Sequence, residues 1–251
     1  MSNIVLEDND RQEQNHAVII LASGLSQRLG QPKQLLVKNG EPLITYMIRL
    51  AASTNPQFIV VVIPDKHPAI ASAVTELAIQ YPAVQAVLNS KPDTGMADSL
   101  CLGIETIASF EIASLDADSI ERVLIMGVDQ VLLDESHLTA LLAGDQSVVA
   151  SGYCSWQRLE KHQNLDEAES NKNSATRKPA NHIIGLPLAI NYKLLKQWQA
   201  MLAGDKGLRY LIRRLPADQI GTVINDNLTY DIDTPEQLIY AKQRGWLDKK
   251  S

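Results

Sequence analysis

Short, unbroken runs of apolar residues recur along the chain, separated by longer stretches of mixed polarity. Six runs contain β-branched residues: 17–22, 58–63, 84–88, 122–126, 147–151 and 221–224. Runs of this kind, bounded by polar turns, are typical of strands that are buried on both faces of a sheet. We therefore predict a strand at each of these six positions.

The stretches between the runs place apolar residues at helical spacing. In residues 42–53, one helix face collects Leu43, Met47, Leu50 and Ala51. Similar patterns predict helices near 67–80, 96–109, 135–143, 192–202, 206–214 and 235–244. Alternation of strands and helices favours an α/β fold: a three-layer, Rossmann-like, mostly parallel sheet with helices on both faces.

Two segments depart from this alternation. Residues 1–16 are polar and net acidic, and we predict a flexible N-terminal tail there, followed by a single domain over 17–245. Residues 157–182 contain no aromatic or β-branched apolar residue and carry many charges of both signs. Such a segment cannot bury enough apolar surface to offset the entropy of ordering, so we predict a polar surface insertion.

Composition narrows the class of protein. The net charge is −6 over 251 residues, which argues against a nucleic-acid or membrane-surface binder. The two cysteines, Cys101 and Cys154, form no CxxC, so a disulfide framework or a zinc site is not expected. No run approaches the ~18 apolar residues of a membrane span, and no signal peptide is evident. We expect a cytoplasmic protein.

The loop after the first predicted strand carries candidate chemistry. Residues 21–36 read LASGLSQRLGQPKQLL, which fits neither GxGxxG nor GxxxxGK[ST]. Gly24, Ser26, Arg28, Gly30 and Lys33 remain as a pattern. Glycines let backbone N–H groups approach a phosphate, and the two cations add charge. The alternative interpretation is a flexible surface loop with solvated cations.

Carboxylates follow two later segments. Asp129 comes after the strand at 122–126, where a hard cation such as Mg²⁺ would be held. The alternative interpretation is an aspartate that belongs to a loop or caps a helix. In residues 230–238, a capping box of Thr234 and Gln237 explains the start of a helix. It leaves Asp231 and Asp233 unexplained, and we expect one of them to face the pocket.

Taken in order, these segments resemble one family closely. Residues 23–36 match [AG]-G-x-S-x-R-M-G-x-x-K-x-L-L, and 128–131 match a G-D-Q-P or A-D-Q-P. Three further matches are G-H-P-V at 185–188, G-D-x-G-x-R at 204–209 and D-I-D-T-P at 231–235. The chain is thus similar to the MobA-like nucleotidyltransferases, the molybdenum cofactor cytidylyl- and guanylyltransferases. Its departures are Ser23, Leu29, Val131 and Leu186.

The resemblance implies a nucleotide-diphospho-sugar transferase fold and a reaction. A phosphate of molybdopterin attacks the α-phosphorus of a nucleoside triphosphate and expels pyrophosphate. By this resemblance Lys33, Arg28 and Asp129 are the catalytic residues, and Asp129 and Asp233 hold Mg²⁺. The nucleotide-binding set consists of Leu21, Ala22, Gly24, Ser26, Arg28, Lys33, Asn89 and Gly95, with Leu21, Ala22, Asn89 and Gly95 near the base.

The nucleotide and the acceptor are less well specified. The form of the opening loop resembles the cytidylyl branch, so we expect CTP rather than GTP, with a molybdoenzyme as a possible client. One alternative is a nucleotidyltransferase acting on another phosphorylated acceptor, such as a sugar phosphate. The other is a non-catalytic nucleotide-binding chaperone that delivers the molybdenum cofactor. No nucleic-acid or membrane partner is expected.

Overall fold

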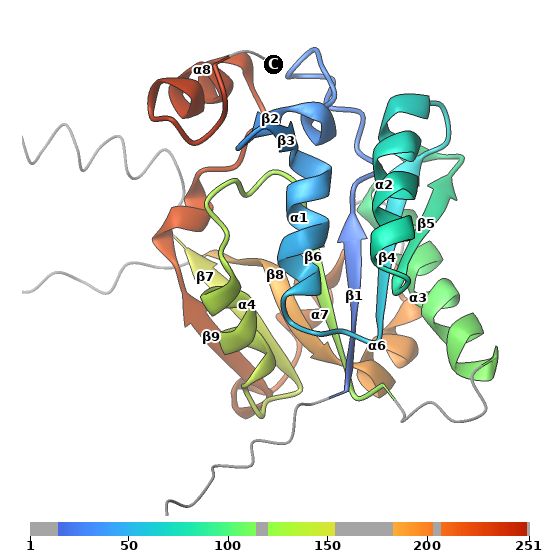
Figure 1. Cartoon of the computed structure of the whole chain (residues 1–251). Helices are drawn as coiled ribbons and strands as arrows, with labels where there is room; N and C mark the ends of the chain where they lie inside the picture. Colours follow the sequence, from blue (N-terminus) through green and yellow to red (C-terminus); the bar gives the residue numbers. More distant parts are fainter. Residues whose placement is uncertain (1–14, 114–119, 154–182, 203–206, 250–251) are drawn as a thin grey trace, which may run out of the picture.

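The computed structural model describes residues 15–113, 120–153, 183–202 and 207–249, which contain a seven-stranded sheet in the order β5-β4-β1-β6-β8-β7-β9 (Figure 1). The strands are β1 (His16–Leu21), β4 (Phe58–Pro64), β5 (Val84–Asn89), β6 (Arg122–Gly127), β7 (Val148–Tyr153), β8 (Ile183–Asn191) and β9 (Ile220–Ile224). Of these strands only β8 runs antiparallel to its neighbours, β6 and β7. The predicted mostly parallel α/β sheet is confirmed.

Helices cover both faces of the sheet. On one face lie α1 (Leu43–Ala52), α2 (Pro68–Gln80), α4 (Glu135–Leu142) and α8 (Pro235–Gln243); on the other lie α3 (Met96–Ala113), α6 (Tyr192–Gln199) and α7 (Leu208–Ile212). Short 3-10 turns are η1 (Lys33–Leu35), η2 (Pro92–Thr94), η3 (Ala217–Gln219) and η4 (Asp226–Thr229), and a small hairpin pairs β2 (Val37–Lys38) with β3 (Glu41–Pro42).

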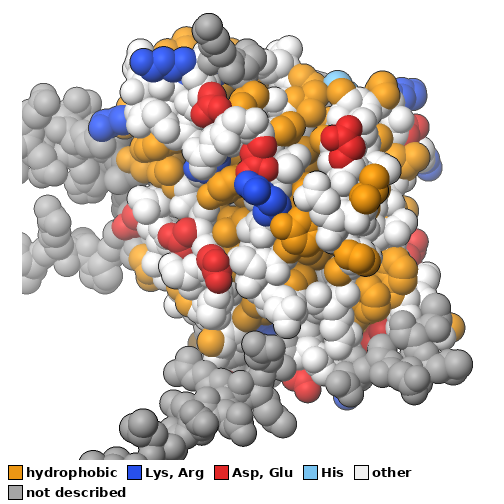
Figure 2. Space-filling model, viewed as in Figure 1, with side chains coloured by type: hydrophobic (Ala, Val, Ile, Leu, Met, Phe, Trp, Pro, Cys, Tyr) orange, Lys and Arg blue, Asp and Glu red, His pale blue; other side chains and the backbone are white. Residues whose placement is uncertain are grey.

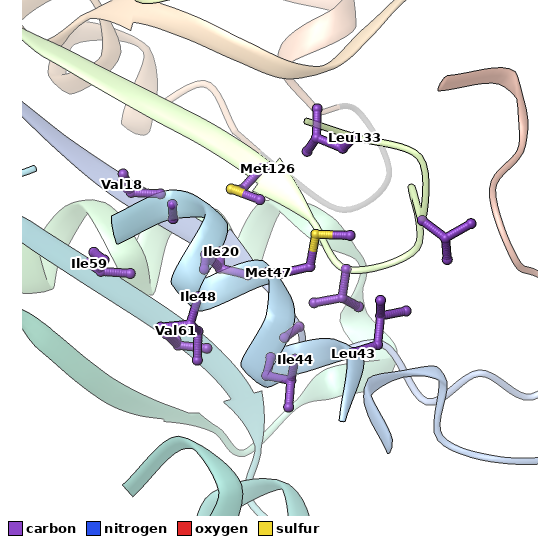
Figure 3. Packing of buried hydrophobic residues seen from close by; sticks show 14 of the residues in the cluster. Val18, Ile20, Leu43, Ile44, Met47, Ile48, Ile59, Val61, Met126 and Leu133 are labelled. Atoms are coloured by element: carbon purple, nitrogen blue, oxygen red, sulfur yellow. The ribbon is translucent and has the colours of Figure 1, made fainter. Parts of the chain in front are cut away.

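The central strand β1 is buried on both faces, as its unbroken apolar run predicts. Val18 and Ile20 belong to the cluster under α1, whereas Ala17 and Ile19 belong to the cluster under α3. Figure 3 shows side chains of α1, including Met47 and Ile48, packed over β1 and β4. This packing fixes the carboxyl end of β1, from which the candidate loop departs.

The predicted elements that carry candidate residues meet at one edge of the sheet. Six strands run in the same direction, so the loops after β1, β4, β5 and β6 lie together at the upper edge in Figure 1. The segment that connects β9 to α8 reaches the same edge. Ligands of such sheets bind beyond the carboxyl ends of the strands.

Some sequence predictions differ from the structure, and others concern residues outside the described ranges. Strand β8 was not predicted, and β1 begins at His16, inside the predicted tail, where His16 is buried. The insertion at 157–182 and the tail up to residue 14 lie outside the described residues, as do residues 203–206 of the G-D-x-G-x-R match.

Candidate active site

The loop from residue 22 to residue 32 leaves β1 and turns back on itself. The N–H groups of Leu29 and Gly30 both donate to the carbonyl of Ser26, and the Ser26 Oγ accepts from the Lys33 N–H at 3.2 Å. Ser26 has φ of 52° and Gly30 has φ of 75°. The left-handed backbone at these two positions closes the turn, and at Gly30 it costs nothing because no Cβ is present.

The tip of this loop presents unpaired backbone donors. Within the described part of the chain, the N–H groups of residues 24–28 donate to no other residue. Gly24, Leu25, Gln27 and Arg28 are exposed, and Ser26 is half-buried. A run of free amides on a loop with left-handed backbone is an arrangement that can receive an anion, which is the role we predict for this loop.

A cluster of four charged side chains lies beside the loop; we call it the charged cluster (Arg28, Lys33, Asp129 and Asp233). Lys33 Nζ donates to Asp129 Oδ2 at 2.7 Å and to Asp233 Oδ1 at 2.8 Å. Arg28 Nη2 reaches the other oxygen of Asp233 at 2.7 Å. The structure therefore brings together the three predicted catalytic residues and both predicted metal ligands.

Electrostatics in this cluster favour the charged forms of Lys33 and Asp233. Burial lowers the pKa of Lys33, but the attraction and hydrogen bond of Asp129, together with those of Asp233, outweigh it and raise the pKa above its usual value. Burial by itself raises the pKa of Asp233. Lys33 and then Arg28 lower this pKa by more, so that it lies below its usual value. Lys33 is a permanent cation here, so it can neutralise phosphate charge but cannot serve as a base at neutral pH.

Asp231 lies near the same cluster, and within the described part of the chain it forms no ion pair, although Lys33 attracts it from a distance. Burial, followed by repulsion from Asp129 and Asp233, raises its pKa to about 6. Gln237 Nε2 approaches Asp231 Oδ1 at 3.4 Å, while Ile232 between the two aspartates packs into the core. Only Asp233 contacts Lys33 and Arg28, whereas Asp231 contacts Gln237, so the expectation that one of the two aspartates faces the pocket stays a prediction.

Backbone contacts fix the two acidic segments to each other. Gln130 and Asp231 form an isolated antiparallel bridge, and the Ile232 N–H donates to the Asp129 carbonyl at 3.2 Å. The predicted capping box at the start of α8 is present, with Gln237 Oε1 also accepting from the Asp233 N–H. Asp129 and Asp233 thus face each other although they are far apart in the sequence.

Gln130 connects these segments to β8. Its side chain is buried, and Nε2 donates to the carbonyl of Leu186 at 2.8 Å. Leu186 stands where the family's motif has histidine. The three motifs at 128–131, 185–188 and 231–235 therefore lie side by side, which their spacing in the sequence does not reveal.

The residues expected near the base lie on the opposite side of the loop. Leu21 is half-buried, Ala22 is buried, and Gly95 directly precedes α3 and has φ of 100°. The Asn89 side chain is buried and fully engaged: Nδ2 donates to Ser99 Oγ at 3.0 Å, and Oδ1 accepts from the Lys91 N–H at 2.8 Å. Asn89 can therefore shape this part of the site, but its side chain is not free to read a base.

A second polar cluster stands behind the loop; we call it the neutral cluster (Ser23, Asn89 and Ser99). The hydroxyls of Ser23 and Ser99 are 2.6 Å apart, and all three side chains are buried. They join the carboxyl ends of β1 and β5 to the first turn of α3. Ser23, where the family's motif has glycine or alanine, thus adds a contact between the loop and the neighbouring elements.

A cleft opens between the loop and the ends of β4 and β5. Its volume is about 330 Å³, and it is lined by Leu25, Pro64, Asp65, Lys66, His67, Ser90, Lys91, Pro92, Asp93 and Thr94. Leu25 of the loop lines this cleft, and Arg28 of the same loop belongs to the charged cluster. Figure 2 shows acidic and basic side chains interspersed over the face drawn in Figure 1, without a broad basic area for a nucleic acid.

Comparison with known proteins decides the family. The model of the MobA-like NTP transferase domain matches residues 18–220. The chain belongs to this family. It is therefore a nucleotidyltransferase, as its motifs indicated, and a nucleoside triphosphate is its substrate. No match was found among curated protein sequences.

Solved structures share the fold of this nucleotidyltransferase at low identity. Rv0371c of Mycobacterium tuberculosis has a TM-score of 0.64 and 16% identity, over 92% of this chain and 99% of that chain. A nucleotidyl transferase from Methanothermobacter has a TM-score of 0.64 and 18% identity, over 92% and 97%. A 4-diphosphocytidyl-2C-methyl-D-erythritol synthase from Anaerococcus prevotii has a TM-score of 0.60 and 15% identity, over 92% and 96%.

The carboxylates of this nucleotidyltransferase fit a divalent cation held jointly with a substrate. Among the described residues, no three His, Cys, Asp or Glu side chains gather into a closed metal site. Two carboxylates, Asp129 and Asp233, do converge on one cationic atom, Lys33 Nζ. Mg²⁺ typically takes one or two carboxylates and completes its shell with phosphate oxygens and water, so this pair suits it.

Among the described helices, none is long and apolar enough to cross a membrane.

Sequence reasoning missed some residues of the site. Gln34 was passed over, although it is buried directly beneath the loop. Tyr153, at the end of β7, lies against Gly185, because a Cβ added to Gly185 would fall 2.4 Å from its hydroxyl. A glutamine following a lysine gives no signal of burial, and Gly185 was noted only as part of a motif.

Proposed function

We propose that this nucleotidyltransferase transfers the cytidylyl group of CTP to the phosphate of molybdopterin and uses Mg²⁺. One observation carries the proposal: the free amides of residues 24–28 stand beside a lysine held between two carboxylates. Amides and cations suit a triphosphate, and the carboxylate pair suits the metal that accompanies it.

Each part of the site has a role in binding the triphosphate. The amides around Gly24 and Ser26, together with Arg28, would hold the β- and γ-phosphates. Arg28 is suited to this because its side chain is 73% exposed and already reaches the charged cluster at Asp233. Lys33, only 13% exposed, would lie against the α-phosphate and the leaving oxygen.

The chemical step is an in-line displacement. An oxygen of the acceptor phosphate attacks the α-phosphorus, the bond from that phosphorus to the bridging oxygen breaks, and pyrophosphate leaves with the electron pair. Such a reaction depends on positioning and on charge neutralisation more than on acid–base chemistry. Mg²⁺, when held by Asp129 and Asp233, would neutralise charge on the α-phosphate. Lys33 and Arg28 would stabilise the charge that develops on the leaving group.

The arrangement of the edge suggests which substrate lies where. The loop separates the cleft at the ends of β4 and β5 from the charged cluster. The nucleoside would lie toward the cleft, near Leu21, Ala22, Asn89 and Gly95. The acceptor would approach from the side of β6 and β8, where the motifs at 128–131 and 185–188 meet.

CTP is favoured over GTP by the loop. Residues 24–28 have the form of the cytidylyl branch, and the aspartates of 231–233 stand where guanylyl relatives tend to have asparagines. A site discriminates bases when the wrong base leaves buried polar groups unpaired, at ~1–3 kcal/mol for each group. The cleft of about 330 Å³ adds a limit on size.

A second candidate is transfer to another phosphorylated acceptor, such as a sugar or alcohol phosphate. Two positions on the acceptor side support it: Leu186 replaces the motif's histidine, and Val131 replaces its proline. Leu186 lies at the contact between the Asp129 loop and β8, where an acceptor would be recognised, and Val131 is buried in that loop.

Product analysis tests both candidates. The protein is incubated with Mg²⁺ and equal CTP, GTP and ATP, and with either molybdopterin or a panel of sugar and alcohol phosphates. Cytosine dinucleotide formed with molybdopterin would support the proposal. Guanine dinucleotide would overturn the choice of CTP, and turnover with the panel alone would favour the second acceptor class. Binding of nucleotide without any turnover would indicate a carrier.

A further inference from the structure

Gln34 follows Lys33 directly but faces a different part of the site. The two residues belong to the 3-10 turn η1, in which consecutive side chains point about 120° apart, since such a helix has three residues per turn. Lys33 therefore reaches the carboxylates, whereas Gln34 is directed beneath the loop. Gln34 is 1% exposed.

The amide of Gln34 holds two carbonyls at the start of the loop. Nε2 donates to the Ala22 carbonyl at 2.6 Å and to the Gly24 carbonyl at 2.9 Å. In a planar trans peptide the C=O and the following N–H point in opposite directions. Because both carbonyls turn toward Gln34, the N–H groups of Ser23 and Leu25 turn away from it. The Leu25 N–H is one of the free donors at the loop tip.

The same side chain carries a cost that packing does not explain. Gln34 Oε1 is buried and has no hydrogen-bond partner among the described residues. A buried acceptor without a partner is destabilising, and an apolar side chain of similar shape would avoid this. The two donors of Nε2 are therefore the feature that an apolar residue would lose, and they act on the loop backbone.

We propose that Gln34 is a positioning residue for the anion site, which fixes the Ala22 and Gly24 carbonyls so that the loop amides face the triphosphate. This inference rests on the proposed nucleotidyl transfer for its substrate. It concerns the binding of phosphate groups, however, and not the identity of the nucleotide or acceptor.

Two variants with side chains of similar size to glutamine separate the loss of the hydrogen-bond donors from a change in packing. Gln34→Met keeps the shape without polar atoms, and Gln34→Glu keeps the shape but replaces the donors by an acceptor. The matched control is Gln57→Met at the opposite edge of the sheet, where the Gln57 N–H donates to the His16 carbonyl at the start of β1. Affinity for inorganic tripolyphosphate, without metal, is measured by calorimetry on the full chain.

We expect Q34M to bind tripolyphosphate roughly 10-fold more weakly than wild type, since two hydrogen bonds that orient the loop are lost. Q34E should be weaker still at pH 8. On lowering the pH, its affinity relative to wild type should recover, as the introduced carboxyl gains a proton and can donate again. With CTP as substrate, KM should rise while kcat stays within a few-fold, because the interaction is made equally in the ground and transition states.

Wild-type protein provides a test that does not depend on folded variants. In amide NMR spectra, tripolyphosphate should shift the Gly24 and Leu25 resonances and leave Gln57 unmoved. Absence of these shifts would overturn the proposal, as would unchanged affinity in Q34M or an equal loss in Q57M. Failure of wild type to transfer a nucleotide, with tripolyphosphate binding intact and sensitive to Q34M, would overturn the proposed reaction and leave the role of Gln34 standing.

Discussion

The charged cluster and the neutral cluster lie on two sides of one loop and differ in how deeply their side chains are buried. In the charged cluster, the side chains of Asp129 and Asp233 are 29% and 28% exposed, and that of Arg28 is 73% exposed. In the neutral cluster, Ser23, Asn89 and Ser99 are exposed by 5% or less. The charged groups keep contact with water, and the neutral ones do not.

The difference follows from the cost of desolvation. A neutral hydroxyl or amide can be buried at little cost once it is hydrogen-bonded, whereas burial of an ion costs several kcal/mol even when the ion is paired. A buried neutral network can therefore hold the loop in place, and partly exposed ions can exchange partners when phosphate and metal arrive. We assign stability to the neutral cluster and turnover to the charged cluster.

The largest effect is expected when the charged cluster loses a member. Lys33→Ala and Asp129→Asn should remain folded but lose roughly 10²–10³ in kcat/KM, because a charge aimed at the transition state contributes ~3–4 kcal/mol. Steady-state kinetics measure the loss of kcat/KM, and circular dichroism checks that the variants remain folded. Lys196→Ala is the control, since Lys196 forms an ion pair with Glu111 far from the loop. Turnover within a few-fold of wild type would remove either residue from the mechanism.

The neutral cluster should respond in stability. Ser99→Ala leaves Asn89 Nδ2 with only a long contact to Ser23, so we expect a loss of about 1–2 kcal/mol, or roughly 2–8 °C in melting temperature. Ser109→Ala on the same helix removes an exposed hydroxyl that bonds to the Glu105 carbonyl and should be nearly neutral. Equal melting temperatures for the two variants would mean that the neutral cluster does not stabilise the loop.

Asp231 provides a smaller effect of opposite sign. Its folded pKa of about 6 exceeds the unfolded value of ~3.9, so the folded state loses stability as the pH rises from about 4 to 6. Asp231→Asn should therefore be more stable than wild type above pH 6, by about 1 kcal/mol after allowance for partial exposure, and equal to it below pH 4. Denaturant unfolding of metal-free protein at several pH values measures this.

Asp233→Asn is the matched contrast, because the pKa of Asp233 is lowered in the folded state. It should destabilise the protein at neutral pH, and it should impair catalysis more than Asp231→Asn does. The reverse order in activity would mean that Asp231 is the metal ligand.

The smallest effect is expected for the predicted polar insertion. Replacing residues 158–181, which lie outside the described residues, by a short Gly/Ser linker should leave the melting temperature and nucleotide affinity nearly unchanged. A segment without apolar anchors adds little to a core, and long surface loops cost little to close. A fall of many degrees would refute the predicted insertion, and loss of acceptor use alone would assign it to the acceptor site.

Much of the fold was predictable because its strands are buried on both faces and so appear as unbroken apolar runs. The meeting of Lys33 and Asp129 followed from a general property of parallel sheets, since their strands end at one edge, whereas Asp233 was assigned to the site by the resemblance to the family. Strand β8 escaped prediction because Gly185 and Pro187 interrupt its apolar pattern. The structure accommodates them at a register shift between Ala150 and Ser151 of β7, where Ser151 Oγ donates to the Pro187 carbonyl.

The supporting residues were predictable only in part. Gln34 and Asn89 look like surface residues in the sequence, and they are buried only because the loop doubles back over η1 and α3 begins beside β5. Their role depends on which carbonyls and hydroxyls come within hydrogen-bond distance. Local sequence carries no record of such tertiary contacts.

The two hydrogen bonds of Lys33 also determine when the site can form during translation. Asp129 lies 96 residues and Asp233 lies 200 residues further along the chain. At ~5–20 residues per second, translation separates Lys33 from Asp233 by roughly 10–40 s. A nascent chain that has already formed β1, β4, β5 and β6 therefore carries the loop amides and one carboxylate but lacks the second. Catalytic competence should arise only when the segment before α8 leaves the ribosome and docks against Gln130.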